Sequence, residues 1–314
     1  MQGNADRLHW FLRSSMRENL EYGLVRAVAG CLGRMPRGLA RLLAGCLAFA
    51  VYWCFGRLRR VGVRNLQLAL PELSSKTRKK ILRGVYIHLG WQLVEFCRMM
   101  RYTAENTRDW MRTEGLEHYL AAQARGKGVL IITGHLGAWE LSSFYHSLMG
   151  HPMGMIIRNL DNRRLDEYVN GIRCLHGNFV ISKDDFGRGL LKAIHAGGAV
   201  GILMDTNMTP PQGEFVPFFG INACTGTGLA HIARQTGAAV LPGFMFWEPA
   251  ERRYVLRFGP EVEMPRTANR AADILEGTRR STAVIESWIR RYPDQWLWIH
   301  RRWKTRPPGE PGLY

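Results

Sequence analysis

The strongest constraint on the fold of this chain is a short apolar run that ends in a turn of small residues. Residues 128–133 read Gly-Val-Leu-Ile-Ile-Thr, and residues 134–138 read Gly-His-Leu-Gly-Ala. The apolar run predicts a buried strand, and residues 139–148 predict the first turns of a helix. In α/β proteins, the turn from a strand into a helix is a common position for a ligand-binding or active site.

The turn contains two side chains that together suit proton transfer. His135 lies at the end of the predicted strand, and Glu140 follows five residues later, near the start of the helix. With 10 histidines and 26 acidic residues among 314, chance alone gives about one such pair, so the pair needs support from its context. An imidazole can act as a base while a carboxylate orients it, and Gly134 and Gly137 leave backbone amides accessible to an oxyanion. The alternative is a core histidine with Glu140 as a solvated helix residue.

Predicted strands and helices alternate along most of the chain. The predicted strands are residues 129–133, 153–157, 179–181, 199–204, 239–246 and 254–258. The predicted helices are residues 76–100, 116–124, 140–149, 164–175, 188–196, 228–236 and 271–292. This alternation predicts an α/β fold with a mixed sheet flanked by helices.

The N-terminal part of the chain contains one long apolar segment. Its 17 residues, 39–55, are apolar except for Arg41, and arginines lie on both flanks. This length is the short limit for crossing a bilayer, so the segment predicts a spanning helix, an interfacial helix or a buried core helix. Basic residues on both sides leave the orientation open, and residues 1–19 lack the apolar core of a secretory signal. We expect a membrane-associated helical segment over residues 1–60, an α/β domain over residues 61–306 and a flexible tail over residues 307–314.

The charge of the chain indicates an anionic partner. Its 43 Lys and Arg residues against 26 Asp and Glu residues give a formal net charge of +17. Such a surplus is typical of proteins that bind nucleic acid, acidic lipid, or a phosphorylated or acidic substrate. The six cysteines form no Cys-x-x-Cys pair and have no histidine at metal-ligand spacing. We therefore expect buried thiols in a reducing compartment, with no disulfide and no structural metal.

Several ordered blocks of sequence form a more specific pattern than the His-Glu spacing alone. The blocks are residues 64–66, 71–74, 115–118, 126–129, 134–140, 158–162, 201–205, 215–220, 237–242 and 292–304. Taken together, they resemble the bacterial lipid A biosynthesis acyltransferases, which are the lauroyl and myristoyl transferases of the lysophospholipid acyltransferase superfamily. The resemblance covers about residues 20–306 and implies an acyltransferase α/β fold behind an N-terminal helical membrane anchor.

The resemblance also implies roles for individual residues. His135 would take the proton from a hydroxyl group, and Glu140 would orient His135, as the acid does in a catalytic triad. Arg158, in the position of the family's arginine block, suits a phosphate; the alternative is a surface arginine that pairs with Asp161. The further substrate-binding candidates are Asp205, Phe218, Phe219 and Gly220. For Asp205, the alternative is an aspartate that stabilises a turn or caps a helix.

We therefore expect a membrane-bound O-acyltransferase that moves a fatty acyl chain from an acyl thioester to a hydroxyl group of a phosphorylated lipid, such as a lipid A precursor. The resemblance implies acyl-carrier protein as the donor, with acyl-CoA as the alternative, and no cofactor. Its other implied partners are the phosphorylated lipid acceptor and membrane lipids, on the cytoplasmic face of the bacterial inner membrane. No Gly-x-Ser-x-Gly nucleophile is present, so we expect direct attack by the acceptor.

Departures from the family's pattern leave the acceptor open. Asp205 is followed by Thr206 where the family commonly has glutamine, and His135 is preceded by Gly134 where asparagine or alanine is frequent. A lysophospholipid or an aminolipid is an alternative acceptor. A different class is a non-enzymatic basic module that binds nucleic acid or anionic membrane through the arginines and tryptophans of residues 288–303. The ordered catalytic blocks, which a binding module does not need, favour the enzyme, and we expect no nucleic-acid partner.

Overall fold

A mixed sheet of seven strands forms the centre of the computed structural model, which describes the backbone of residues 2–314 and the side chains of residues 16–314. The strands are β1 (Met111–Glu114), β2 (Val129–Thr133), β3 (Met153–Ile157), β4 (Phe179–Ser182), β5 (Ala199–Leu203), β8 (Ala239–Glu248) and β9 (Arg253–Phe258). Their order is β1-β9-β8-β2-β5-β3-β4, and all neighbours are parallel except β8 and β9. The structure thus confirms the predicted α/β fold with a mixed sheet.

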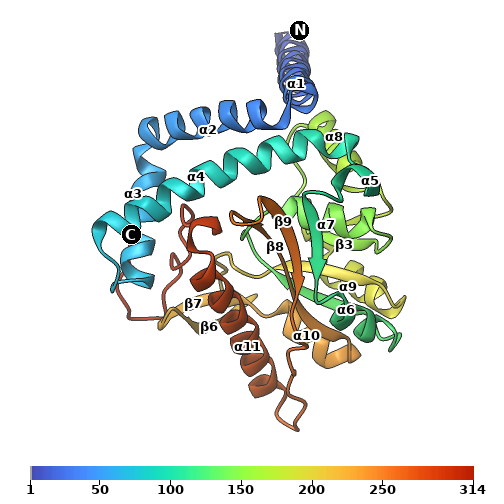
Figure 1. The fold of residues 1–314 in the computed structure, drawn as a ribbon, viewed down its shortest axis with the longest axis vertical. Coiled ribbons are helices and arrows are strands. Elements are labelled where there is room, and N and C mark those ends of the chain that lie inside the picture. The colour runs from blue at the N-terminus through green and yellow to red at the C-terminus, as the bar shows by residue number, and fades with distance from the viewer. Residues whose placement is uncertain (1) are drawn as a thin grey trace.

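Helices cover both faces of the sheet (Figure 1). They are α6 (Leu116–Gln123), α7 (Trp139–Leu148), α8 (Arg163–Arg173), α9 (Phe186–His195), α10 (Gly228–Thr236) and α11 (Arg270–Arg291). Leu130 and Ile132 of β2 join one core with α9, α10 and α11, whereas Val129 and Ile131 join a second core with α6, α7 and α8. Because successive strand side chains point to opposite faces, a strand covered by both layers is apolar throughout. This is the pattern that made β2 recognisable in the sequence.

A separate hairpin of two strands, β6 (Gly213–Phe218) and β7 (Ile221–Gly226), was not among the predicted elements. Its turn consists of Phe219 and Gly220, whose φ angles of 52° and 74° suit the two-residue turns that match the twist of a hairpin. Pro217 lies within β6, opposite Asn222. Proline argues against a strand in a sequence, but it is tolerated here because a two-stranded hairpin leaves strand edges without partners.

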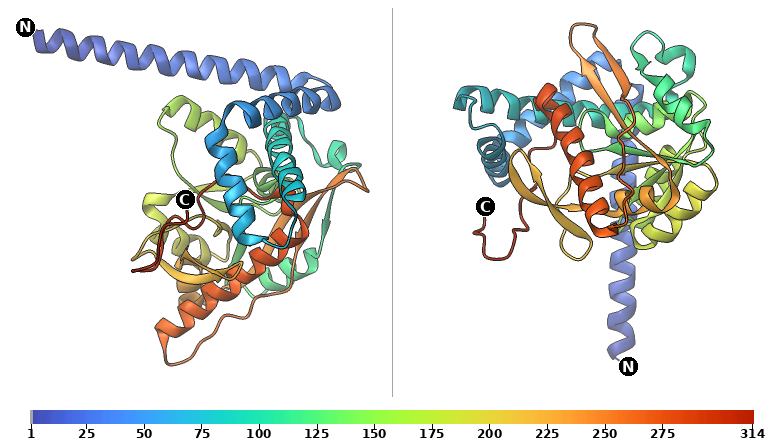
Figure 2. Two further views of the ribbon diagram at one scale, coloured as in Figure 1. Left: turned by 90° about the vertical axis from the view of Figure 1, so that its left-hand side faces the viewer. Right: turned by 90° about the horizontal axis from the view of Figure 1, so that it is seen from below.

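Four helices form the N-terminal part of the chain: α1 (Gln2–Arg34), α2 (Arg37–Cys54), α3 (Gly56–Ala69) and α4 (Ser75–Arg98), and a short helix, α5 (Ala104–Thr107), follows them. Helix α2 packs along α4, while α1 projects beyond the α/β body (Figure 2). Ala40, Ala44 and Ala48 of α2 are buried, and a Cβ at Gly90 of α4 would lie 2.7 Å from the carbonyl oxygen of Ala44. Small residues therefore allow the two helices to approach closely. The expected domain boundary after residue 60 falls inside α3. Leu66 and Ala69 of this helix belong to the core of the α/β domain, so α3 is part of both regions.

A buried cluster of charges fixes the start of α2 to α4. Glu95 of α4 is fully buried and accepts hydrogen bonds from Nε of Arg37 at 3.0 Å and from Nη2 of Arg41 at 2.6 Å. The hydroxyl of Tyr102 donates to the same carboxylate at 2.5 Å, and Arg41 lies over the ring of Trp247, 4.3 Å from its centre. The one arginine within the apolar segment thus points into the protein. Removing one partner from such a buried cluster costs about 3–5 kcal/mol.

The C-terminal tail is bound to α3. The hydroxyl of Tyr314 donates to Oδ1 of Asn65 at 2.5 Å, and Nε of Arg64 donates to the carbonyl oxygen of Leu313 at 2.9 Å. These contacts hold the last two residues of the predicted tail, Leu313 and Tyr314, against the domain.

Candidate active site

The carboxyl ends of three parallel strands bring the predicted site residues to one edge of the sheet. His135 follows β2, Asp205 follows β5 and Arg158 follows β3. Strands β2, β5 and β3 are neighbours and run parallel. The residues that follow them therefore lie side by side, at the edge where α/β sheets bind their ligands.

His135 is paired with Asp205. Its Nδ1 donates a hydrogen bond to Oδ1 of Asp205 at 3.0 Å, and its backbone amide donates to Oδ2 at 2.7 Å. Burial alone would lower the pKa of His135, but the charge and the hydrogen bond of Asp205 raise it above the ordinary histidine value. Because Nδ1 carries the donated proton, Nε2 is the nitrogen that is left to accept one.

Asp205 is enclosed and its carboxylate is occupied by protein groups. Its side chain is 0 % exposed, and Oδ2 also accepts from Nε1 of Trp296 at 2.8 Å. Burial opposes ionisation, yet His135 and Trp296 hold the pKa of Asp205 well below its ordinary value. Gly134 makes room for the carboxylate, because a Cβ there would lie 3.0 Å from Cγ of Asp205. The prediction that Asp205 binds substrate is therefore corrected: it lies where an acid would orient the imidazole.

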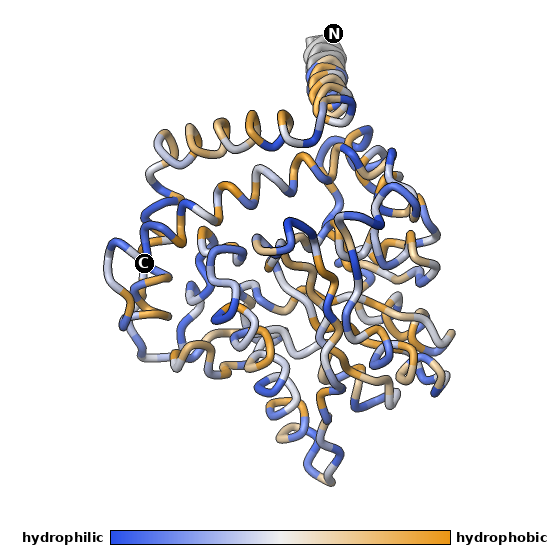
Figure 3. Tube along the Cα trace, viewed as in Figure 1, coloured by the Kyte–Doolittle hydropathy of each residue, from blue (hydrophilic) through white to orange (hydrophobic). Residues whose placement is uncertain are grey.

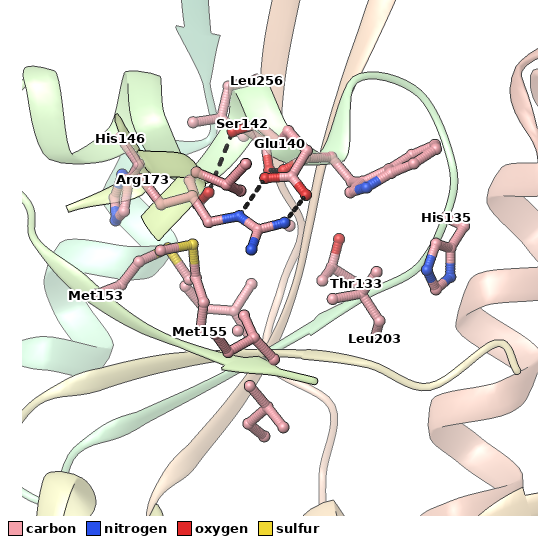
Figure 4. A pocket seen from close by; sticks show the side chains of 18 of the residues that line it. Thr133, His135, Glu140, Ser142, His146, Met153, Met155, Arg173, Leu203 and Leu256 are labelled. Carbon is pink, nitrogen blue, oxygen red and sulfur yellow. Dashed lines mark hydrogen bonds and ion pairs between the residues drawn. The ribbon is translucent and has the colours of Figure 1, made fainter. Parts of the chain in front are cut away.

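Glu140 pairs with Arg173 of α8 instead of His135. Nη2 of Arg173 donates to Oε1 of Glu140 at 2.5 Å, and Nε donates to Oε2 at 2.9 Å. This two-pronged geometry is typical of strong arginine–carboxylate pairs. Figure 4 shows the pair on one side of a cavity that also contains His135. The predicted contact between Glu140 and His135 is therefore not made, since Arg173 holds both oxygens of Glu140 and Asp205 makes the contact with the imidazole.

The turn between β2 and α7 is fixed by neighbouring segments. Gly137 has a φ angle of 64°, and a Cβ there would lie 2.0 Å from the carbonyl oxygen of Met245, so only glycine fits. Its amide donates to the carbonyl oxygen of Gln295 at 2.8 Å, and the amide of Ala138 donates to that of Met245 at 2.7 Å. The amide of Gly137 is therefore committed to the protein, which corrects its prediction as an oxyanion donor. Gly134 keeps that candidate role.

Two cavities meet at His135. The first has a volume of about 230 Å³ and lies between the sheet and helices α7 and α8. The second has a volume of about 600 Å³ and lies beside the starts of α9 and α10. His135, Arg158 and Leu203 line both cavities. A substrate in either cavity therefore reaches the same imidazole.

Two buried polar groups of the first cavity have no hydrogen-bond partner among the residues that the structure describes. They are Oγ1 of Thr133 and Nε2 of His146. Burial, reinforced by the charge of His151, lowers the pKa of His146 to about 3, so this imidazole is neutral at physiological pH. Glu140 and Arg173 neutralise each other, and the inner part of the cavity therefore suits an uncharged group.

Arg158 lies exposed at the rim of both cavities. Its side chain is 83 % exposed, and the carboxylate of Asp161, which is itself fully exposed, lies 3.9 Å from its Nη2. Exposed pairs of this kind contribute only about 0–1 kcal/mol. The guanidinium can therefore exchange Asp161 for an anionic ligand beside His135.

Phe218, Phe219 and Gly220 lie away from both cavities. Phe218 and Phe219 are only 1 % and 6 % exposed, and their rings pack on Trp296 and Trp298 at centroid distances of 5.5 and 5.8 Å. Gly220 completes the hairpin turn, and none of the three lines either cavity. The prediction that they bind substrate is corrected: the phenylalanines fix the hairpin to the segment that follows α11.

The segment that follows α11, residues 292–304, supports the site, and its tryptophan-rich sequence does not reveal this role. The amide of Leu297 donates to the carbonyl oxygen of His135 at 3.0 Å. The buried guanidinium of Arg302 donates to the carbonyl oxygen of Thr206 at 3.1 Å. Burial lowers the pKa of Arg302 to about 10, so it remains charged at neutral pH. Two turns that carry site residues are thus held from one side by the C-terminal segment.

The tryptophans of the same segment are enclosed in the core. Trp296, Trp298 and Trp303 are each 0 % exposed, whereas base stacking requires exposed rings. These three rings therefore cannot stack on bases as the alternative interpretation requires, which leaves the half-buried Trp288 of α11 as the one tryptophan of residues 288–303 with exposed surface. Among the residues described, no group of three His, Cys, Asp or Glu side chains could hold a metal ion. The six cysteines are free thiols, but Cys31, Cys46 and Cys54 are exposed, which corrects the expectation that the cysteines are buried.

Comparison with known proteins places most of the chain in one family. Residues 13–305 match the family described as bacterial lipid A biosynthesis acyltransferase. The chain is 31% identical to the lipid A biosynthesis palmitoleoyltransferase of Escherichia coli K12, over 82% of each protein. It is 28% identical to the lauroyltransferase of that organism, over 82% of this chain and 83% of the relative. It is 24% identical to the myristoyltransferase, over 91% and 87%.

Proposed function

Because the chain belongs to the bacterial lipid A biosynthesis acyltransferase family and is an acyltransferase, we propose that it transfers a fatty acyl chain from an acyl thioester to a hydroxyl group of a phosphorylated lipid A precursor. The donor is acyl-carrier protein, whose acidic surface would complement the net charge of +17. His135 is the general base and Asp205 orients it. The observation that carries this proposal is the meeting of two cavities at His135.

The proposed chemistry follows from the position of Nε2 of His135. An acceptor hydroxyl that hydrogen-bonds to Nε2 gives its proton to the imidazole while its oxygen attacks the thioester carbonyl carbon. The carbonyl oxygen becomes an oxyanion; when the carbonyl re-forms, the carbon–sulfur bond breaks, and the imidazolium returns the proton to the thiolate. The products are an ester and a thiol. Asp205 stabilises the imidazolium between these two steps, as the acid does in a Ser-His-Asp triad.

The two cavities suit different parts of the substrates. The sheet side of the first cavity carries apolar side chains, among them Met153, Met155 and Leu256, and we assign this cavity to the acyl chain. The second cavity is larger and is also lined mainly by apolar side chains, but it includes polar groups such as Lys183 and Gln212. We assign it to the acceptor, because a phosphorylated headgroup needs polar and cationic partners.

Arg158 tests the assignment of the acceptor. Arg158→Ala should lower kcat/KM for a phosphorylated acceptor about ten- to a hundred-fold, the effect of losing one charged hydrogen bond. Arg158→Lys should retain part of the activity, because lysine supplies charge without the planar fork. The defect should shrink on a dephosphorylated acceptor, which lacks the partner of the arginine. The matched control is Arg163→Ala, an arginine that is 87% exposed and pairs with Glu167. Equal losses on both acceptors would contradict phosphate binding by Arg158.

We propose that α2 lies along the membrane surface, on the cytoplasmic face of the inner membrane. Among the described residues, Arg37–Cys54 is the one helix long and apolar enough to cross a membrane. However, one face of it packs on α4, and its first arginines bind Glu95. Apolar residues recur along the helix after its polar start (Figure 3). An exposed apolar face beside arginines is typical of interfacial helices. The large exposed apolar residues of α2 are Leu39, Leu42, Leu43, Leu47, Phe49 and Trp53.

The N-terminal helices also reach the opening of the site. The side-chain amide of Asn162, on the loop that begins with Arg158, donates to the carbonyl oxygen of Glu18 in α1 at 2.9 Å. Its oxygen accepts from the amide of Leu165 at 3.3 Å and so caps α8. Helix α1 is therefore a neighbour of the Arg158 rim. A lipid acceptor held at a membrane beside these helices would lie next to both cavities, which supports the proposed orientation.

Membrane binding by α2 can be measured with charged substitutions on its exposed face. The double variant Leu43→Glu/Leu47→Glu should bind vesicles of anionic phospholipid at least about tenfold more weakly than the wild type, because each leucine loses about 1.5–3 kcal/mol of apolar burial. Leu120→Glu is the matched control, since Leu120 lies on α6 and its exposure of 44% is close to the 47% of Leu43. Co-sedimentation with the vesicles gives the partition coefficient. Unchanged sedimentation of the double variant would place the anchor elsewhere.

The activity itself is tested with the full chain in mixed micelles. The protein is incubated with an acyl-carrier-protein thioester and, in separate reactions, with a phosphorylated lipid A precursor, a lysophospholipid and an aminolipid. Mass spectrometry should show one added acyl ester on the lipid A precursor, with one thiol released per ester. Transfer only to the lysophospholipid or the aminolipid would overturn the acceptor, and acyl-CoA tested in parallel identifies the donor.

A further inference from the structure

The hydroxyl group of Thr133 is buried and lacks a partner within the described part of the protein. Thr133 is the last residue of β2 and is 8 % exposed, and its Oγ1 makes no hydrogen bond. By contrast, the buried threonines 107, 278 and 282 lie in helices, and each donates to a backbone carbonyl at 2.8 Å. A strand end offers no such local carbonyl to Thr133. A buried hydroxyl without a partner is unfavourable, and a ligand that supplies an acceptor removes that cost.

Thr133 lies at the end of the first cavity where the reaction would occur. Side chains two residues apart on a strand point to the same face, and Ile131, Thr133 and His135 all line this cavity. Figure 4 shows Thr133 between His135 and the Glu140–Arg173 pair. A thioester whose chain occupies this cavity and whose carbonyl carbon lies near Nε2 of His135 would hold its carbonyl oxygen close to Thr133.

Several other hydrogen-bond donors around this point are already committed. The amides of His135 and Gly137 donate to Asp205 and to Gln295. The guanidinium of Arg173 is held by both oxygens of Glu140. Acyl transfer needs donors aimed at the oxygen on which negative charge develops. The hydroxyl of Thr133 is a donor in the cavity that the protein has not already used.

We propose that Thr133 is a catalytic residue whose hydroxyl donates a hydrogen bond to the carbonyl oxygen of the acyl thioester, and then to the oxyanion that forms when the acceptor attacks. This inference rests on the acyl transfer proposed above. The proton stays on Thr133 throughout, and no bond to the residue forms or breaks. The hydrogen bond strengthens as charge grows on the oxygen, so it stabilises the transition state more than the bound donor.

The test uses two substitutions that separate the hydroxyl from the volume of the side chain. Thr133→Val keeps the shape but removes the donor, and it should lower kcat about 10²-fold while KM for the donor changes little. Thr133→Ser keeps the donor and should restore most of this rate. Thr278→Val is the matched control, because it also removes the hydroxyl of a fully buried threonine, but in α11, and it should leave kcat unchanged. Each variant is assayed as the full chain in micelles with an acyl-carrier-protein thioester, and its thermal unfolding is recorded.

The outcomes separate the role of Thr133 from the proposed function. A wild-type rate for Thr133→Val would overturn the Thr133 role alone, because acyl transfer itself would remain. A raised KM with unchanged kcat would also overturn it, since the hydroxyl would then bind the ground state and the transition state equally. Failure of Thr133→Ser to recover activity in a folded protein would show that packing matters and the donor does not. A wild-type protein without transfer activity would overturn both proposals.

Discussion

Replacement of His135 by alanine is expected to lower kcat/KM for acyl transfer by about 10²–10⁴, which is the usual contribution of a positioned general base. The fold should persist, because the hydrogen bond at 2.7 Å from residue 135 to Oδ2 of Asp205 comes from the backbone amide. Trp296 also continues to hold that carboxylate. The variant therefore separates loss of chemistry from loss of structure.

The measurement is ester formation on the lipid acceptor, together with a thermal unfolding curve. His195→Ala serves as the control, because His195 is an exposed residue at the end of α9 and lines neither cavity. It should transfer acyl groups at the wild-type rate. A folded His135→Ala protein with wild-type turnover would exclude His135 as the base.

The position of the site could be predicted from the sequence because it depends on local signals. Residues 128–140 contain a buried strand, a turn rich in glycine and the start of a helix, and the structure has β2, the turn and α7 at these positions. Arg158 likewise follows the apolar strand β3. Each of these strands can be recognised from its own sequence. Because parallel strands end at the same edge of a sheet, the residues that follow them lie at that edge. The side-chain partners at that edge were harder to predict.

The pairing of His135 with Asp205 joins residues 70 positions apart, and it depends on the parallel pairing of β2 with β5. No spacing in the sequence reveals which strands are neighbours. Glu140 illustrates the opposite error, because its closeness to His135 in sequence suggested a contact. Arg173, which is 33 positions away, approaches Glu140 through the packing of α8 and holds its carboxylate. Arg41 is a similar case. Its side chain points into the protein because it pairs with Glu95, which is 54 residues away in the sequence.

Replacement of Asp205 by asparagine is expected to lower kcat/KM by up to about 10⁴, as the same change does in a Ser-His-Asp triad. Oδ2 of Asp205 accepts two hydrogen bonds, from the amide of His135 and from Trp296. An asparagine that keeps both bonds must place its carbonyl oxygen there and turn its NH₂ group toward Nδ1 of His135. Nδ1 must then accept a proton instead of donating one. The remaining proton moves to Nε2, which can no longer act as the base.

The pH dependence of the Asp205→Asn variant distinguishes this role from simple structural support. The charge of Asp205 raises the pKa of His135, so removing the charge should lower that pKa. The base must be neutral to work, and activity falls as the pH drops through its pKa. In the variant, the acid limb of the profile should therefore move to lower pH, while the plateau also falls.

Glu140→Gln is the matched carboxylate variant. The charge of Glu140 acts on His135 more weakly than that of Asp205, so the acid limb of the Glu140→Gln profile should move less. A profile of kcat/KM between about pH 5 and pH 9 covers the range in which histidine titrates. A larger shift for Glu140→Gln than for Asp205→Asn would return the orienting role to Glu140.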